Sequence, residues 1–124
     1  MSDSTKHISL QVRDQGGIVY TVRLRVAEQN EAGTLSILTA SGELAEQFEL
    51  TRLKKDKDGT RLTCNVSGTT ATLSLERDKN QPQLRVSASL FVPIFDAVYQ
   101  IDAAEQERFV AWINDLRVGI LTSS

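Results

Sequence analysis

The chain has 124 residues, of which 40% are hydrophobic and 24% charged, as is usual for a single soluble domain. Its formal net charge of −2 argues against a protein that coats nucleic acid or that holds a membrane surface through a basic segment. No apolar run approaches the roughly 20 residues that span a bilayer, the start lacks the apolar segment of a secretory signal, and one cysteine allows no internal disulfide. We therefore expect a cytoplasmic single domain over residues 1–124, with a disordered tail at 1–6 and a second tail at 120–124.

Alternation of apolar and polar residues with a period of two dominates the chain and predicts antiparallel strands with one buried face. The first two such segments are residues 8–12 and 18–26. Opposed residues of a hairpin share a face of the sheet, and a three-residue loop at 15–17 satisfies this rule by pairing Val12 with Tyr20. The sequence thus predicts a first hairpin in this register.

Three further turns follow from short polar or glycine-containing pairs, at Asp58-Gly59, Gly68-Thr69 and Lys79-Asn80. The second of them would place Cys64 opposite Leu73. The apolar residues before Thr51-Arg52 have even numbers and the one after has an odd number. They can share one face of the sheet only if an extra residue is inserted, so a β-bulge is expected there. We count about seven antiparallel strands, which form a curled sheet or a small barrel.

One amphipathic helix, predicted over residues 102–118, ends the chain. Asp102 is placed to cap it, Glu105 would complete an acidic capping box, and Gly119 is suited to the position after its end. Its apolar stripe consists of Phe109, Trp112, Ile113 and Leu116. A single amphipathic helix after a curled sheet is expected to cover an open end or seam of that sheet.

Residue patterns of known catalytic sites are missing from the sequence. The sole histidine, His7, faces outward in the predicted register, opposite Arg25. Cys64 lies on an apolar strand face without a basic neighbour, which favours core packing over a nucleophile. The segment around Asp56 and Asp58 resembles part of a calcium loop but lacks its first and last ligands. We therefore expect no catalytic residue, no metal site and no cofactor, and the protein is predicted not to be an enzyme.

Basic residues of the first hairpin form one candidate binding feature. Arg23 and Arg25 project from the outer face of one strand, and Arg13 lies across the hairpin. Guanidinium groups suit phosphate and other anions, so these three residues are candidate ligand-binding residues. The alternative is that they are solvated and protect a strand from unwanted pairing.

The most apolar stretch of the chain, "SLFVPIFDAVY", is the second candidate feature. Alternation breaks there, and Pro93 argues against an ordinary central strand. The candidate partner-binding residues are Leu90, Phe91, Val92, Ile94 and Phe95. Either this segment is exposed and docks a partner, or it turns inward and is sealed by the face of the helix that carries Trp112.

The closing helix, "ERFVAWINDL", resembles that of pleckstrin-homology-like domains, in which a tryptophan plugs one end of a seven-stranded barrel. Trp112 occupies the matching position. In members that bind phosphoinositides, basic residues of the first two strands hold the headgroup, so the resemblance assigns this role to Lys6 or Arg13 together with Arg23 and Arg25. The short, non-basic first hairpin loop and the acidic balance of this chain argue against a lipid headgroup.

A second resemblance is to PilZ-like domains, small bacterial barrels often followed by a helix. The segment "AVYQIDAAEQERFVAWINDL" is similar to their last strand and helix. Their nucleotide-binding signature, Arg-x-x-x-Arg followed by Asp-x-Ser-x-x-Gly, does not occur in this chain. The similarity therefore implies a fold but not the binding of cyclic-di-GMP.

These observations together predict a non-catalytic interaction module of the adaptor or regulatory kind. It would act through a strand edge or through residues 90–95, on another protein or on a second copy of the chain. The alternative is a small-ligand-binding barrel that holds an anionic headgroup, a nucleotide or an apolar molecule. Nucleic acid is not expected as a partner.

Overall fold

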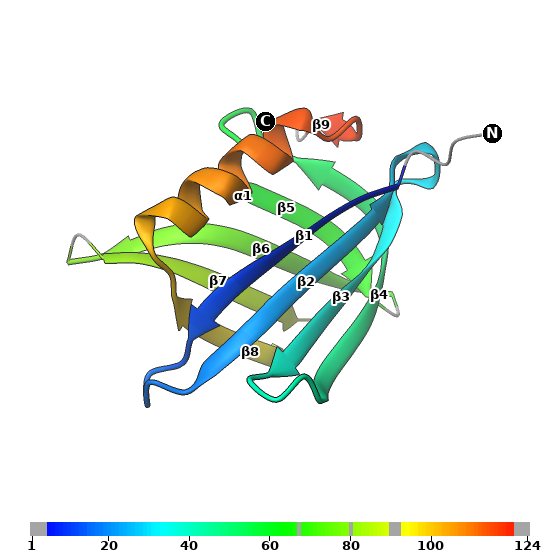
Figure 1. Cartoon of the computed structure of the whole chain (residues 1–124). Coiled ribbons are helices and arrows are strands. Elements are labelled where there is room, and N and C mark those ends of the chain that lie inside the picture. Colours follow the sequence, from blue (N-terminus) through cyan, green and yellow to red (C-terminus); the bar gives the residue numbers. More distant parts are fainter. Residues whose placement is uncertain (1–4, 67, 80, 90–92, 121–124) are drawn as a thin grey trace.

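The computed structural model describes residues 5–66, 68–79, 81–89 and 93–120 and is mainly β, with one α-helix near the C-terminus (Figure 1). The strands are β1 (Thr5–Arg13), β2 (Val19–Ala27), β3 (Ala32–Thr39), β4 (Leu44–Lys55), β5 (Arg61–Val66), β6 (Thr69–Asp78), β7 (Gln81–Ser89), β8 (Pro93–Gln100) and β9 (Gly119–Ile120). The helices are the 3-10 turn η1 (Glu28–Asn30) and α1 (Ala103–Asp115). Thr5, Lys6 and Ile120, which were expected in the tails, thus belong to strands.

The expectation of about seven strands is wrong, because the described residues form nine. The two strands that the sequence analysis missed are β8 and β9. Strand β8 begins at Pro93, and a proline is tolerated as the first residue of a strand, where its missing N–H breaks no interior pairing. Strand β9 has only two residues and follows the helix, so it has no alternation to reveal it.

The long strands form a ring-like sheet. Each strand from β1 to β8 pairs antiparallel with the next, and β8 returns to β1. This last contact consists of one residue pair, Arg13 with Gln100. The two strands are therefore staggered: residues 93–99 of β8 extend beyond the end of β1, and helix α1 follows β8 along the rest of the edge of β1 (Figure 1).

Two of the predicted hairpins have the expected register. Val12 pairs with Tyr20, and the three-residue loop between Asp14 and Ile18 contains Gly17 in the left-handed region, with a φ of 85°. Strands β6 and β7 pair as the turn at 79–80 requires, with Leu75 opposite Leu84. The first outward pair, His7 with Arg25, is also confirmed.

The predicted register of β5 and β6 is wrong by two residues. Cys64 pairs with Ala71 rather than with Leu73, and the last pair before the turn is Val66 with Thr69. A shift of two residues leaves every side chain on its own face of the sheet, so the alternation of apolar residues could not exclude it.

The bulge in β4 is confirmed. Its pairing with β5 shifts between Thr51 and Lys54, and Arg52 has a φ of 54°. The bulge lets Leu53 point inward although it follows Leu50 by three residues; both are almost fully buried. The amide of Leu53 donates to the carbonyl of Glu31 at 2.9 Å rather than to β5.

Aliphatic side chains fill the interior of the ring. Every strand from β1 to β8 contributes inward-facing buried residues, among them Leu10, Leu24, Leu35, Leu62 and Leu84. The cavity between Leu35, Phe48 and Phe95 has a volume of only about 10 Å³. This volume holds at most one water molecule, so the middle of the ring is a packed core.

Helix α1 covers one end of this core. Phe109, Ile113 and Leu116 are fully buried and belong to the same apolar cluster as the strands, whereas Trp112 is only partly buried. The helix ends at Asp115, three residues before the predicted end at 118.

The ends of the helix differ from the expected caps. Asp102 is the N-cap residue, but its side chain makes no capping hydrogen bond. At the C-terminus, the Nζ atom of Lys55 donates to the carbonyls of Ile113, Asn114 and Leu116, at 3.2, 3.0 and 2.6 Å. This ammonium group satisfies carbonyls that a glycine motif would otherwise satisfy. Gly119, predicted as the capping glycine, instead belongs to β9, where it pairs with Lys54 of β4.

Of the described helices, none has the length and apolar composition that crossing a membrane requires.

Candidate functional site

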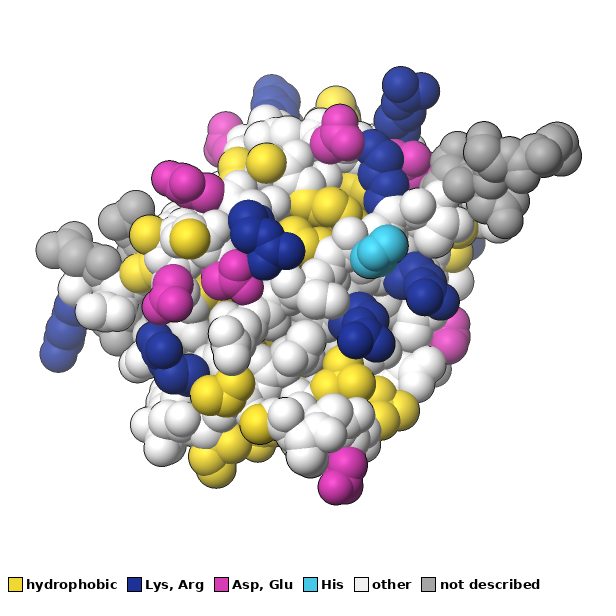
Figure 2. Space-filling model, viewed as in Figure 1, with side chains coloured by type: hydrophobic (Ala, Val, Ile, Leu, Met, Phe, Trp, Pro, Cys, Tyr) yellow, Lys and Arg dark blue, Asp and Glu magenta, His cyan; other side chains and the backbone are white. Residues whose placement is uncertain are grey.

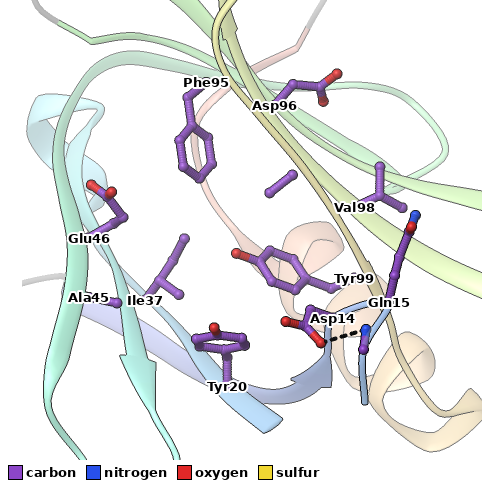
Figure 3. Close-up of a pocket in the computed structure, with 12 residues that line it drawn as sticks. Asp14, Gln15, Tyr20, Ile37, Ala45, Glu46, Phe95, Asp96, Val98 and Tyr99 are labelled. Atoms are coloured by element: carbon purple, nitrogen blue, oxygen red, sulfur yellow. Dashed lines mark hydrogen bonds between the residues drawn. The ribbon is translucent and has the colours of Figure 1, made fainter. Parts of the chain in front are cut away.

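A pocket of about 640 Å³ opens at the end of the ring opposite helix α1 (Figure 3). It lies between the overhanging part of β8, the loop after β1, and the first residues of β4. Its described lining consists of Asp14, Gln15, Gly16, Tyr20, Ile37, Ala45, Glu46, Phe95, Asp96, Ala97, Val98 and Tyr99. The volume is within the usual range for pockets that take a ligand or a partner's side chains.

One wall of the pocket is the free edge of β8. Five consecutive residues of this strand, 95–99, line the pocket. Side chains of a strand alternate between its two faces, so an unbroken run of lining residues means that the edge itself borders the cavity. Within the described chain, these residues pair only with β7, because β8 meets β1 only at Gln100. Their backbone thus offers hydrogen-bonding groups to the pocket.

The two tyrosines of the chain form the apolar floor of the pocket. The rings of Tyr20 and Tyr99 meet edge to face, with centroids 5.9 Å apart and planes at 61°. Tyr99 is only 7% exposed, yet its hydroxyl points into the pocket (Figure 3) and forms no hydrogen bond with another described residue. Burial raises the pKa of this hydroxyl, and the nearby Tyr20, Asp14 and Glu46 raise it further. Tyr99 therefore presents a neutral hydroxyl to any occupant.

Phe95 joins the pocket to the core. Its ring meets that of Phe48 edge to face at 5.3 Å and 62°, and the side chain is half-buried against the interior cluster. Phe95 also lines the small cavity inside the ring. This aromatic pair closes the pocket toward the middle of the molecule.

Carboxylates supply the charge of the pocket. The Oδ1 atom of Asp14 accepts the amides of Gly16 and Ile18, each at 2.9 Å, and this fixes the loop after β1. Glu46 is exposed and stands opposite Ile37 in the β3–β4 ladder, on the inner face.

Asp96 differs from these two carboxylates because it is already paired. Its two oxygens accept from Arg85 at 3.0 and 2.8 Å, and this pairing lowers its pKa. The described lining contains three carboxylates and neither lysine nor arginine. The pocket is therefore acidic.

Two exposed apolar residues belong to segments that contribute to the pocket lining, although neither lines the pocket itself. Ile18, in the loop after β1, is 57% exposed, and Leu44, the first residue of β4, is 55% exposed. The third large exposed apolar residue of the described chain, Ile120, lies in β9 near the other end of the ring. Exposed apolar residues close to a pocket are typical of a contact surface.

The basic residues predicted to bind an anion lie outside this pocket. Arg23 and Arg25 project from the outer face of β2, opposite Ser9 and His7, and Figure 2 shows basic side chains around the histidine on that face. Arg13 is paired opposite Val19, four residues or about 13 Å along the hairpin from Arg23. The structure therefore brings Arg23 and Arg25 together but leaves Arg13 apart.

Arg13 also has an acidic partner. Its Nη2 atom lies 3.3 Å from Oδ1 of Asp102, and the Asp102 side chain makes no capping hydrogen bond to the helix. Both side chains are largely exposed, so this ion pair adds little stability. Whether Arg13, Arg23 and Arg25 hold an anion stays a prediction.

The predicted partner segment is only partly visible in the structure. Leu90, Phe91 and Val92 lie outside the described residues, and of Ile94 the backbone alone is described, as part of β8. Phe95 lines the pocket. The break in alternation thus indicated the neighbourhood of the pocket but not its other walls.

Sequence reasoning missed Tyr20, Tyr99, Asp14 and Glu46. Tyr20 was expected in a strand and Tyr99 at the end of the apolar stretch, whereas Asp14 and Glu46 were not singled out. The one signal in the composition concerns the tyrosines: the chain has only two, and both line this cavity. Residues almost 80 positions apart carry no pattern in the sequence that would join them.

Cys64 and His7 do not form a reactive pair. The thiol is buried, and burial raises its pKa to about 12. Its Sγ atom lies 3.8 Å from the carbonyl of Ala71, within β6. His7 is exposed on β1. No group of three histidine, cysteine or acidic side chains in the described part of the chain is arranged to hold a metal ion.

Comparison of the chain with models of protein families, with curated proteins and with solved structures yields no match.

Proposed function

We propose that the protein is a non-catalytic interaction module that binds an extended segment of a partner protein along the free edge of β8. The observation that carries this proposal is the edge at residues 95–99, which borders the pocket of about 640 Å³. An extended peptide can add to such an edge as a further strand. Its backbone hydrogen bonds then supply affinity, and a neighbouring pocket that receives one of its side chains supplies specificity.

The surroundings of the pocket support this mode of binding. Ile18 and Leu44 are exposed in two of the segments that contribute to the pocket, and a bound segment that extends over them would cover them. Each apolar side chain that is removed from water contributes about 1–2 kcal/mol to binding. This contribution offsets part of the entropy that a flexible peptide loses when it becomes ordered.

The alternative function, a small-ligand carrier with an interior site, has less support. The cavity inside the ring measures about 10 Å³, whereas small-molecule pockets usually exceed about 300 Å³. An anionic headgroup or nucleotide would have to use Arg23 and Arg25 on the outer face, away from the pocket. The likeness to pleckstrin-homology-like domains stays a prediction, as does a cytoplasmic location.

Selection of random peptides displayed on phage tests the proposal with the intact protein as bait. We expect an enriched group of peptides that bind the wild type. The double variant Ile18→Ser, Leu44→Ser should bind them about 30-fold more weakly or worse, because two apolar contacts are lost. The matched control is Ile120→Ser, which changes a residue of equal exposure at the other end of the ring.

Two results would overturn the proposal. One is a selection that enriches no peptide above the background of an uncoated surface. The other is equal weakening by the double variant and by Ile120→Ser. A second copy of the chain is the other possible occupant of this edge. In that case sedimentation equilibrium shows a dimer, which the double variant Ile18→Ser, Leu44→Ser dissociates and Ile120→Ser leaves intact. Such a dimer would replace the partner protein in the proposal.

A further inference from the structure

We infer that the pocket receives a positively charged side chain, an arginine or lysine of a basic protein segment. This inference rests on the proposed function and adds the chemistry of its partner. It is carried by carboxylates, tyrosine rings and a tyrosine hydroxyl that share one cavity.

The charge of the cavity is the first argument. Of its three carboxylates, only that of Asp96 has a cationic partner among the described residues. Asp14 engages the loop amides through Oδ1 alone, and Glu46 forms neither an ion pair nor a hydrogen bond with the described part of the chain. Two carboxylates at one mouth repel an anionic group and attract a cationic one.

The tyrosine pair is the second argument. An ammonium or guanidinium group is attracted to the face of an aromatic ring, and the attraction increases where water is excluded. Tyr20 and Tyr99 form the floor of the cavity, and Phe95 closes its inner side. A cation between this floor and the carboxylates would therefore contact both kinds of group.

The hydroxyl of Tyr99 is the third argument. The tyrosine is more than nine-tenths buried, and its hydroxyl points into the cavity without a partner in the described chain (Figure 3). In the free protein this hydroxyl is left to water, so an occupant that displaces the water is favoured only if it supplies hydrogen bonds in its place. Guanidinium and ammonium groups carry several N–H donors and no acceptor, and the hydroxyl oxygen can accept from them.

The strand edge defines how this side chain would be presented. Alternate side chains of an added strand point to the same face, so one residue enters the cavity while its immediate neighbours point away. The recognised segment is therefore extended, with one basic residue at the pocket and apolar residues near it that contact Ile18 and Leu44.

The test repeats the peptide selection on wild type and on Glu46→Arg. Glu46 is exposed, so the variant is expected to keep the fold, which thermal unfolding checks. Wild type should enrich peptides with an arginine or lysine, and Glu46→Arg should enrich peptides with aspartate or glutamate instead. Glu107→Arg, an equal change of charge on the exposed face of α1, is the matched control and should select the same basic peptides as wild type.

A second measurement uses the best wild-type peptide and its copy with citrulline in place of the arginine. Citrulline keeps the shape and loses the charge, so binding followed by fluorescence polarisation should weaken about tenfold or more. Tyr99→Phe, which removes only the hydroxyl, should weaken the arginine peptide more than the citrulline peptide.

The outcomes separate this inference from the proposed function. Enriched peptides without an excess of basic residues, or equal binding of the arginine and citrulline peptides, would overturn the inference and leave the interaction module intact. A selection that enriches no peptide at all would instead remove the proposed function, and the inference with it.

Discussion

At the scale of single residues, two aromatic side chains carry a polar atom without a partner, but in different surroundings. The Nε1 atom of Trp112 is buried and has no hydrogen-bond partner among the described residues. The hydroxyl of Tyr99 borders the pocket and is open to an occupant. The first is a cost that the fold carries, whereas the second is a group that a ligand can satisfy.

Trp112 is less deeply buried than the other apolar residues of the helix stripe at the closed end of the ring. The pleckstrin-homology resemblance assigned the plug to it, yet Phe109 and Ile113 are the helix residues that lie fully inside the core. Trp112 packs on their flank and leaves its N–H unpaired. The helical stripe was identified correctly, but the depth of each residue within it depends on how the helix is rotated against the sheet.

Substitutions of these two residues should therefore differ in cost. Phe109→Ala removes a fully buried ring and should lower the free energy of unfolding by about 3–5 kcal/mol. Trp112→Phe should lower it by less than about 1 kcal/mol, because removing the unpaired N–H offsets the lost packing. Urea unfolding measures both. If Trp112→Phe proved as costly as Phe109→Ala, Trp112 would be the plug after all.

At the scale of elements, the contact between α1 and β1 depends on Glu105. Its Oε2 atom accepts the amide of Gln11 at 2.7 Å, so a helix side chain satisfies a backbone group on the strand edge that β8 leaves uncovered. Oε1 of the same carboxylate accepts from Arg108 at 2.6 Å. Glu105 was predicted to cap its own helix, but its carboxylate instead accepts a hydrogen bond from the backbone of β1.

The pKa of Glu105 makes this contact dependent on pH. Burial by itself would raise the pKa, but the hydrogen bond from Gln11 and the pairing with Arg108 outweigh it, so the pKa lies below its ordinary value. A carboxyl whose pKa is lower in the folded state stabilises the fold above its ordinary pKa. That stability is lost as the pH falls through the lower, folded value.

The variant Glu105→Gln tests this dependence. At pH 7 it should be less stable than wild type by about 0.5–1.5 kcal/mol, since a neutral amide is a weaker acceptor than a carboxylate. The difference should shrink as the pH falls from about 4.5 toward 3, where the wild-type carboxyl becomes protonated. Thermal unfolding across this range measures it. A difference that stayed constant down to pH 3 would mean that the charge of Glu105 plays no part.

At the scale of the whole molecule, the stagger between β1 and β8 divides the ring into a closed end and an open end. Helix α1 occupies the edge of β1 at the closed end, and the overhang of β8 leaves its own edge uncovered at the open end. The same stagger thus explains both the presence of the helix and the position of the pocket (Figure 1).

Amide hydrogen exchange should reveal this asymmetry. Those amides of residues 95–99 that point away from β7 should exchange at least about 100-fold faster than the amides of Ala71 and Leu73 in β6, which has a neighbouring strand on each side. NMR of the free protein makes the comparison residue by residue. Uniform protection across residues 95–99 would mean that the edge is covered in solution and would contradict the open end.

The strand pattern could be predicted from the sequence because side-chain alternation is local. Residues such as Leu10, Val22 and Leu35 had to face a core, and the loop at 15–17 is the one that keeps them opposed. The bulge near Arg52 followed from the same parity rule. Alternation could not reveal the two-residue shift that pairs Cys64 with Ala71, because such a shift leaves every side chain on the same face of the sheet.

The sequence by itself determined that apolar side chains of alternating strands form the core, and that one amphipathic helix with Phe109 on its inner stripe packs against it. Only the tertiary structure decided that β8 and β1 meet at a single residue pair, and so that Tyr20, Glu46 and Tyr99 surround one pocket. The physical reason is that alternation and helical periodicity are properties of neighbouring residues. Closure of a sheet instead depends on the stagger of its first and last strands, which no local pattern records.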